Sequence, residues 1–128
     1  MSWLSLLLIV KILVTSILVA LPFLFLSKQK LEKTTNISAP TSTFFRLYGV
    51  AILALLVGYS FGIPSAENNQ FPWGVICMGV VSNGGAASLL LISRKSKQNL
   101  ILGIFFALVT LGLVTASIIP QAALQKLW

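Results

Sequence analysis

Four long apolar runs divide this chain, and they limit its possible folds more than any other feature of the sequence. The runs cover residues 3–26, 44–63, 73–92 and 100–119. Twenty residues of α-helix extend about 30 Å, which matches the thickness of the hydrocarbon core of a bilayer. The sequence therefore predicts an all-α membrane protein, a bundle of four transmembrane helices in one domain that covers residues 1–128.

The composition supports lipid as the solvent for most of the chain. Hydrophobic residues make up 57% of it and charged residues 9%, whereas soluble domains carry about 25% charged residues. A small water-soluble domain could not bury so much apolar surface. The net charge of +7 raises the question of nucleic-acid binding, but the basic residues cluster between the apolar runs, as in membrane proteins. We expect no nucleic-acid partner.

Two polar or mixed segments complete the chain. Residues 27–43 form a polar connector in which Lys28 and Glu32 have the spacing of a helical ion pair, worth a few tenths of a kcal/mol. Residues 120–128 are predicted to form a short C-terminal interfacial helix. Pro120 suits the first turn of such a helix, because its missing N–H needs no partner there. Apolar residues then recur at helical spacing, as in helices that lie in the membrane interface.

Basic residues gather in two of the connections between the runs. The connector 27–43 and the turn 93–98 hold six of them, and Arg46 adds a seventh at the start of the next run, whereas the flanks on the other side hold only Lys126. Cytoplasmic loops carry an excess of Lys and Arg. We therefore expect both termini outside and both basic connections in the cytoplasm. The candidate contacts to anionic lipid headgroups are Lys28, Lys30, Arg94, Lys95 and Lys97.

The third run has a polar break at its centre, Ser82-Asn83-Gly84-Gly85. An amide deep in the bilayer, bracketed by residues almost without side chains, suits a buried helix crossing. Thr15 and Thr110 lie at a similar depth in other runs. Asn83 either joins helices by hydrogen bonds, which is the interpretation we favour, or lines a polar cavity.

Lys11 is the most unusual residue of the first run. It lies about 5 Å from the middle of that run by helical rise, where a charge costs at least about 2.5 kcal/mol. It either snorkels to the outer surface or forms a structural pair, or it is a functional cation that binds an anionic lipid or substrate group. Its expected polar neighbours are Tyr59 and Glu67. The candidate intramembrane polar cluster is Lys11, Thr15, Asn83 and Thr110.

Small residues form stripes along three of the runs. The second run ends in a GxxxG pattern made by Gly58 and Gly62. Small residues allow helix backbones to approach closely, so that van der Waals contacts and hydrogen bonds hold the bundle together. Packing within one chain is the interpretation we favour, and a dimer interface is the alternative. The candidate packing residues are Gly58, Gly62, Gly79, Gly84 and Gly103.

The second run opens with Phe45-Arg46-Leu47-Tyr48-Gly49-Val50-Ala51. This segment resembles the start of a span in small four-helix bacterial membrane proteins, loosely of the DoxX type. The resemblance covers this one helix and the number of spans. It implies a bacterial inner-membrane protein and carries over no functional residues. Small multidrug-resistance transporters share the size and span count, but they depend on a glutamate in the first helix, where this chain has Lys11.

The residue content disfavours most enzyme chemistry. The chain has no His and only two acidic residues, which are both Glu, and a single Cys. Histidine-based metal sites, Ser-His-Asp triads and haem ligation by His therefore lack their parts. We expect no enzyme, no catalytic residue, no metal and no cofactor.

Two function classes remain open. The first hypothesis is a non-enzymatic accessory or structural subunit, which would pack beside a membrane-protein partner or a second copy of itself. The second is a small transporter, channel or lipid-binding protein, monomeric or dimeric, with Lys11, Asn83 and Thr110 around a polar intramembrane cavity.

Overall fold

Four helical segments long and apolar enough to cross a membrane make up most of the protein. The computed structural model describes residues 1–93 and 96–127. Within them the segments are Trp3–Phe25, α4 (Ser42–Glu67), α5 (Trp73–Ser93) and α6 (Lys97–Ile118). Each predicted span agrees with one of these segments to within about a turn. The predicted all-α fold of four membrane-spanning helices is confirmed.

The first segment is not a continuous α-helix. It consists of α1 (Trp3–Thr15), a π-helical turn at Ser16–Ala20 and α2 (Leu21–Phe25). Pro22 lies just beyond the π-helical turn, and proline both removes an N–H donor and crowds the preceding turn. Such interruptions are a known cause of local changes in helical winding. π-Turns occur often at functional sites, and this one begins directly after Thr15.

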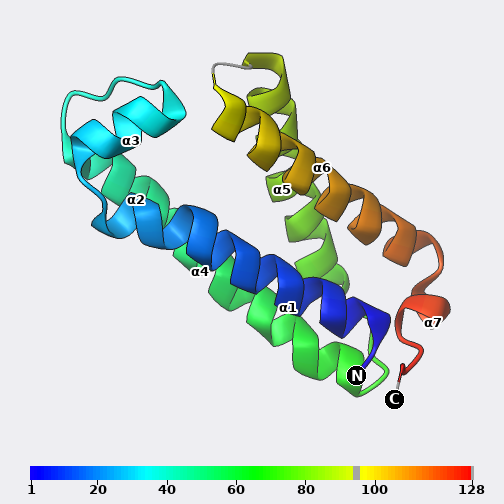
Figure 1. Cartoon of the computed structure of the whole chain (residues 1–128). Coiled ribbons are helices and arrows are strands. Elements are labelled where there is room, and N and C mark those ends of the chain that lie inside the picture. Colours follow the sequence, from blue (N-terminus) through cyan, green and yellow to red (C-terminus); the bar gives the residue numbers. More distant parts are fainter. Residues whose placement is uncertain (94–95, 128) are drawn as a thin grey trace.

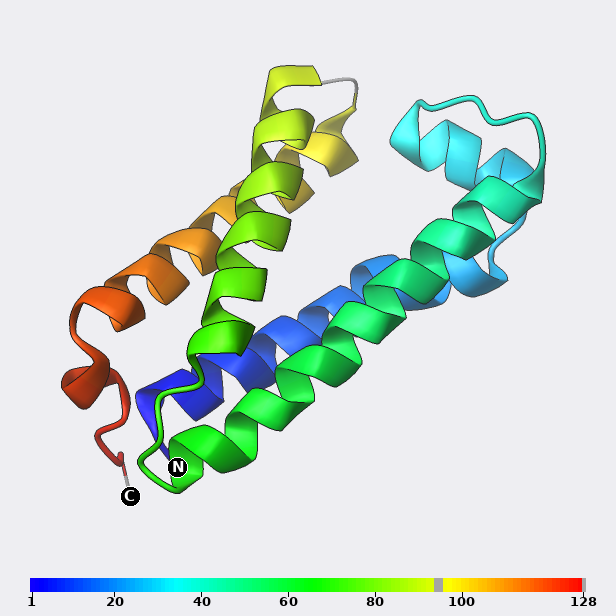
Figure 2. The same ribbon diagram turned by 180° about the vertical axis from the view of Figure 1, so that it is seen from behind.

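The helices form two pairs arranged as a V (Figures 1 and 2). One arm consists of α1 and α2 packed along α4, and the other of α5 packed along α6. The arms meet at the end that holds both chain termini, here called the terminal end. They diverge toward the other end, here called the basic end, where α3 (Lys28–Thr35) and the start of α6 lie.

The main hydrophobic core lies where the two arms meet. Its fully buried side chains come from all four spans, so that no single helix pair forms a core by itself. A second, smaller cluster continues toward the basic end around Phe106 of α6 and Val19 of the π-helical turn. The largest members of the main core are Leu4, Leu8, Leu56, Tyr59, Ile76 and Leu113.

Glycines mark the closest approaches between helices. A Cβ added to Gly79 on α5 would lie 2.6 Å from Leu113 Cδ1 on α6. One added to Gly62 on α4 would lie 2.9 Å from Leu8 Cδ1 on α1. Separations this short are well below van der Waals contact, so a methyl group at either position would force the neighbour to move. Both residues therefore act as packing positions.

The other candidate packing glycines differ among themselves. A Cβ at Gly58 would lie 3.1 Å from Met78, and one at Gly103 would lie 2.9 Å from a leucine of α5. At Gly84 the nearest atom would be Thr110 Cγ2 at 3.5 Å, which is ordinary contact. The GxxxG pattern of α4 thus faces other helices of the same chain. This arrangement favours packing within the chain over a dimer interface for that pattern.

Helix α3 lies where the sequence predicts only a polar connector. The expected pair of Lys28 and Glu32 is present, with Nζ and Oε1 3.5 Å apart. Asn36 ends the helix in the left-handed conformation, with φ of 57°, as C-terminal caps often do. The single apolar side chain of α3, Leu31, is buried against the bundle. Because one leucine gives no hydropathy signal, the helix could not be predicted from apolar periodicity.

Two polar contacts hold the basic end together. Asn99 at the start of α6 donates a hydrogen bond from Nδ2 to the carbonyl of Thr35, the last residue of α3, at 3.1 Å. This bond joins the two arms of the V. Arg46 on α4 donates to the carbonyls of Phe23 and Leu26, at the C-terminal end of α2. These carbonyls have no partner within their own helix, so Arg46 caps α2.

A polar cluster ties the terminal end together around Glu67. Its carboxylate accepts hydrogen bonds from the backbone N–H of Ser2 at 2.9 Å and from the hydroxyl of Ser5. It also lies 3.6 Å from the amino group of Met1 and 3.7 Å from the ammonium of Lys126. The end of α4 is thereby linked to both ends of the described chain.

The C-terminal helix is shorter than predicted for residues 120–128. It covers only α7 (Pro120–Ala123), whose last residue is buried in the core. The following residues turn back, and the N–H of Leu127 donates to the carbonyl of Met1 at 2.9 Å. The residues after Ala123 thus bond to the N-terminus and do not continue the helix. Trp128 lies outside the described residues.

Candidate functional site

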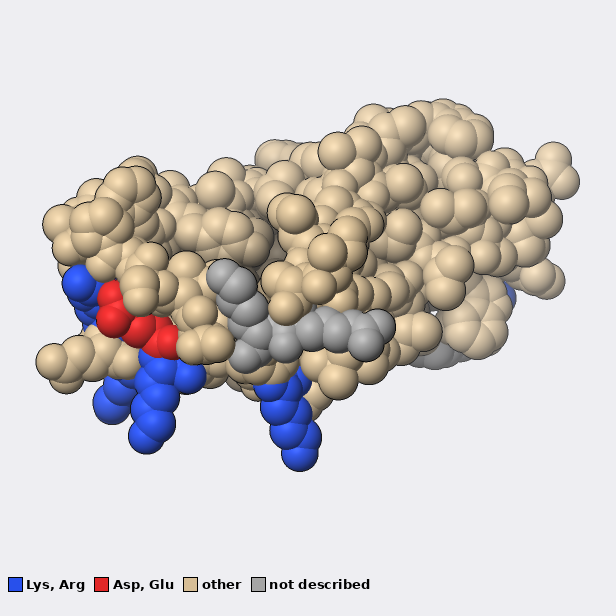
Figure 3. All heavy atoms as spheres, turned by 90° about the horizontal axis from the view of Figure 1, so that it is seen from above, with Lys and Arg blue, Asp and Glu red and all other residues tan. Residues whose placement is uncertain are grey.

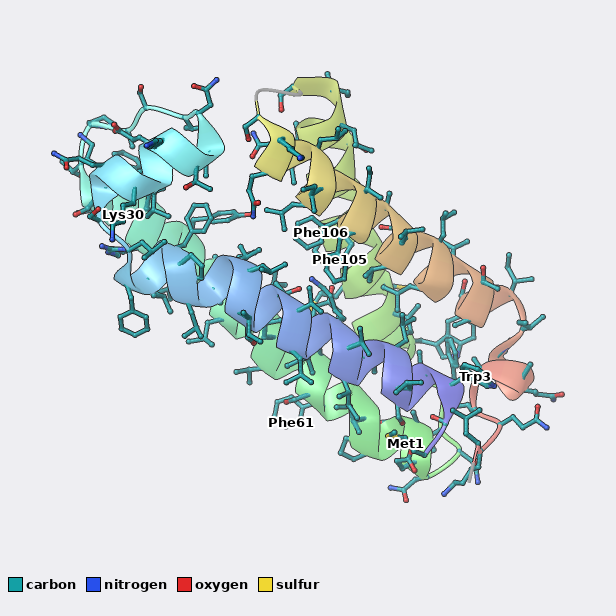
Figure 4. All side chains as sticks on the ribbon, in the orientation of Figure 1. Met1, Trp3, Lys30, Phe61, Phe105 and Phe106 are labelled. Atoms are coloured by element: carbon teal, nitrogen blue, oxygen red, sulfur yellow. The ribbon has the colours of Figure 1, made fainter. Side chains whose placement is uncertain are left out.

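A cavity of about 260 Å³ lies between the two arms, at the depth of the polar break of α5. Side chains from α1, α4, α5 and α6 line it, and most of them are apolar or aromatic. Figure 4 shows the labelled Phe105 and Phe106 of α6 on the inner side of the V. The polar side chains of the lining, apart from Tyr48 near the edge, are Lys11, Thr15, Tyr59, Ser82 and Asn83.

Lys11 is buried beside this cavity, with 4% of its surface exposed. Its ammonium donates a hydrogen bond to Thr15 Oγ1 at 2.8 Å. Thr15 lies one turn further along α1, away from the terminal end, so the ammonium points into the bundle and does not snorkel to the nearer surface. It lies 4.7 Å from the ring centroid of Phe106 and 5.5 Å from that of Tyr59.

No acidic side chain of the chain neutralises this ammonium. The sequence has two acidic residues, Glu32 and Glu67. Glu32 pairs with Lys28, and Glu67 pairs with the amino group of Met1 and with Lys126. Glu67, an expected neighbour of Lys11, therefore belongs to the terminal end. The aromatic faces supply about 0.5–2 kcal/mol each, against an insertion cost of at least about 2.5 kcal/mol for the charge.

Asn83 takes both of the roles that the sequence left open. It is 1% exposed, and its Nδ2 donates to the hydroxyl of Tyr59 at 2.7 Å and to the carbonyl of Gly79 at 2.7 Å. The Tyr59 hydroxyl is also 2.8 Å from Ser82 Oγ. These bonds join α4 to α5, while the same side chains line the cavity. The polar break of α5 is thus a helix crossing and a cavity wall at once.

Three of the four predicted cluster residues share the cavity. Lys11, Thr15 and Asn83 line it, whereas Thr110 does not. The hydroxyl of Thr110 donates to the carbonyl of Phe106 within α6 at 2.8 Å, as a threonine in a helix commonly does. Ser82 joins the site without having been a candidate. Its position beside Asn83 in the polar break was the available signal.

The candidate lipid contacts lie at the basic end, apart from the cavity. Lys30 and Lys97 are exposed there, while Lys28 pairs with Glu32. Figure 3 looks onto this end and shows lysine and arginine side chains projecting along one edge. Arg94 and Lys95 lie outside the described residues.

No protein-family model, curated protein or solved structure matches this chain. The resemblance of residues 45–51 to DoxX-like proteins stays a prediction. Within the described ranges, no three His, Cys, Asp or Glu side chains come together as metal ligands would. The cavity around Lys11 combines a buried cation with hydroxyl and amide side chains of other helices, and it is the candidate site of the described residues.

Proposed function

We propose that this protein binds a small polar or amphiphilic ligand inside the membrane, as a lipid-binding protein or a small transporter. The single observation that carries this proposal is Lys11, a buried cation that lines a cavity and has no acidic partner in the chain. Ionisable residues inside a bundle are costly, and they commonly mark ligand or ion pathways. A ligand that pairs with the ammonium would offset that cost.

The shape of the bundle supports entry of such a ligand from the side. The cavity lies between the arms, and two of its lining residues, Tyr48 and Leu89, are exposed on the outer surface. Concave sites that combine apolar walls with a few convergent polar groups are typical of small-molecule binding. A ligand can therefore reach Lys11 from the bilayer without passing the tightly packed terminal end.

We further propose a bacterial inner-membrane location with both termini outside and the basic end in the cytoplasm. The support is the gathering of Lys and Arg in the two connections at one end, which is how cytoplasmic loops are recognised. Two separate fusions after residue 128 test this orientation. A fluorescent protein that folds only in the cytoplasm should stay dark, and a phosphatase that is active only in the periplasm should be active. The opposite pattern would reverse the orientation.

A second candidate function is an accessory subunit of a membrane complex. One observation favours it. Only 22% of the most apolar stretch of α4 is buried within the chain, and the share is the same for α5. Their remaining surface faces lipid or the helices of a partner. Extraction of the protein in a mild detergent separates the two candidates.

The test is extraction in a mild detergent followed by native mass spectrometry. Wild-type protein is expected to carry one bound non-protein molecule. Ala86 lines the cavity, so Ala86→Phe should remove that molecule. The adjacent Gly85 has open space where a Cβ would stand, so Gly85→Phe should retain it. A ligand-free wild type that co-purifies with a larger membrane protein would instead support the subunit.

A further inference from the structure

The chemistry of the cavity specifies which group it binds. This inference rests on the proposed function, because it concerns the same cavity. We propose that the cavity holds the singly charged oxyanion head of an amphiphile, with Lys11 as its counter-ion. A fatty-acid carboxylate and a phosphodiester lipid headgroup share this chemistry.

The charge balance calls for one negative charge. Among the described residues that line the cavity, Lys11 is the only one with a cationic side chain, and Glu32 and Glu67 are paired elsewhere. Its ammonium has three N–H donors. Thr15 Oγ1 accepts one of them at 2.8 Å, and no other hydrogen bond from this ammonium occurs within residues 1–93 and 96–127. Two donors can therefore serve a single oxyanion.

A further donor faces the same space from α4 and α5. The hydroxyls of Tyr59 and Ser82 share one hydrogen bond at 2.8 Å, so two hydroxyl hydrogens serve a single bond between them. If Tyr59 donates, the Ser82 hydrogen has the carbonyl of Gly79 as an alternative acceptor, 3.4 Å from Ser82 Oγ. If Ser82 donates, the Tyr59 hydrogen has no other acceptor within the described residues. Both residues line the cavity. One of them can thus donate to an oxygen held by Lys11.

The remaining lining indicates that the ligand also has an apolar chain. Apart from the polar groups, the cavity is bounded by aliphatic and aromatic side chains such as Ile52, Leu55 and Phe106. Two further lining residues are exposed on the outer surface, Tyr48 of α4 and Leu89 of α5, the latter by 73%. The cavity therefore extends to the lipid-facing side between α4 and α5.

The cavity volume fits a headgroup but not a whole lipid. A single water needs roughly 10–15 Å³, so about 260 Å³ admits a group of several heavy atoms. A carboxylate or phosphodiester with its first few methylene groups fills this space. The rest of an acyl chain would leave past Leu89 into the bilayer. An amphiphile would use both the polar lining and this apolar exit, whereas a small soluble anion would use only the polar lining.

The test measures binding of defined probes to detergent-purified, delipidated protein by native mass spectrometry. The anionic probes are oleate and dioleoyl phosphatidylglycerol, which separate the two sources. The neutral match is monoolein, and acetate tests the head without a chain. Oleate or the phosphatidylglycerol should bind one to one, at least about tenfold more tightly than monoolein, as a charged hydrogen bond of about 1.5 kcal/mol implies. Acetate should not bind detectably.

Variants separate the charge of Lys11 from general attraction by basic residues. Lys11→Met and Lys11→Gln should each weaken binding of the anionic probe at least about tenfold. Lys11→Gln keeps a polar group that can bond to Thr15, so it is the variant less prone to misfold. Size-exclusion chromatography checks that both variants are folded. Lys33→Met removes an exposed charge of α3 at the basic end that is not a candidate lipid contact, and it should leave binding unchanged.

The possible failures are distinguishable. Equal binding of oleate and monoolein, unaffected by Lys11→Met but abolished by Ala86→Phe, would overturn the oxyanion inference and leave the cavity-binding function intact. Acetate binding as tight as oleate binding would overturn the amphiphile. If wild-type protein binds none of these probes and carries no ligand after extraction, the proposed function fails as well.

Discussion

Gly79 offers the sharpest test of how closely the helices pack. In Gly79→Ala the new methyl group would stand 2.6 Å from Leu113 Cδ1 and 3.1 Å from Tyr59 Cε1. Leu113 is fully buried and Tyr59 is held by hydrogen bonds to Ser82 and Asn83, so neither side chain can swing aside. We therefore expect a loss of stability.

The magnitude follows from two opposing terms. Overpacking a closely packed core costs about 1–3 kcal/mol, whereas replacing a helical glycine with alanine gains up to about 1 kcal/mol. The net effect of Gly79→Ala therefore lies between about zero and a loss of about 3 kcal/mol. Gly85, six residues on in the same helix, meets nothing within 4 Å of an added Cβ. Gly85→Ala keeps only the gain and should be stabilised by up to about 1 kcal/mol.

The assay is reversible unfolding in mixed micelles, followed by tryptophan fluorescence, with both variants measured beside the wild type. The prediction is that Gly79→Ala is the less stable of the two variants, by about 1–3 kcal/mol. Equal stability of the two variants would refute the close approach of α5 to α6 at Gly79. It would also remove the support for Tyr59 as a fixed wall of the cavity.

Three further predictions concern the polar contacts. Asn83→Leu should destabilise the protein by about 0.6–1.7 kcal/mol, the range of interhelical hydrogen bonds in membranes, and an unchanged unfolding midpoint would show that the bond to Tyr59 is absent. Asn99→Ala should speed hydrogen–deuterium exchange in α3 while leaving exchange in α5 unchanged, because the bond to Thr35 joins the arms only at the basic end; unaltered exchange in α3 would contradict that link. Arg46→Gln should speed amide exchange in α2, since it removes a cap, and protection equal to the wild type would refute the capping role.

The locations of the spans follow from the sequence because lipid imposes a simple rule. A segment of about twenty apolar residues has no stable alternative to a helix in a bilayer, so the hydropathy pattern fixes residues 44–63 and 73–92 closely. α3 lacks such a pattern, since Leu31 is its single apolar residue. Its formation depends on burial of that leucine against the other helices.

The sequence identifies the main residues of the candidate site, but it does not show which of them lie together in the folded protein. Lys11 and Asn83 stand out because each is polar within an apolar run, which is a local property. The pairing of helices decides which polar side chains meet, and this placed Thr110 outside the cavity and Glu67 at the terminal end. Helix pairing depends on contacts between residues far apart in the chain. The glycines indicate that close packing occurs, and do not indicate between which helices.

The central claim, that Lys11 faces a cavity that holds an anionic head, can be tested at the atom concerned. Protein with lysines labelled at Cε and Nζ would be titrated with oleate and followed by nuclear magnetic resonance, with the Lys11 signal assigned by its absence in Lys11→Met. We expect one equivalent of oleate to shift the Lys11 signal and to leave that of Lys33, an exposed lysine of α3, in place. An unchanged Lys11 signal, or an equal shift of all lysine signals, would contradict it.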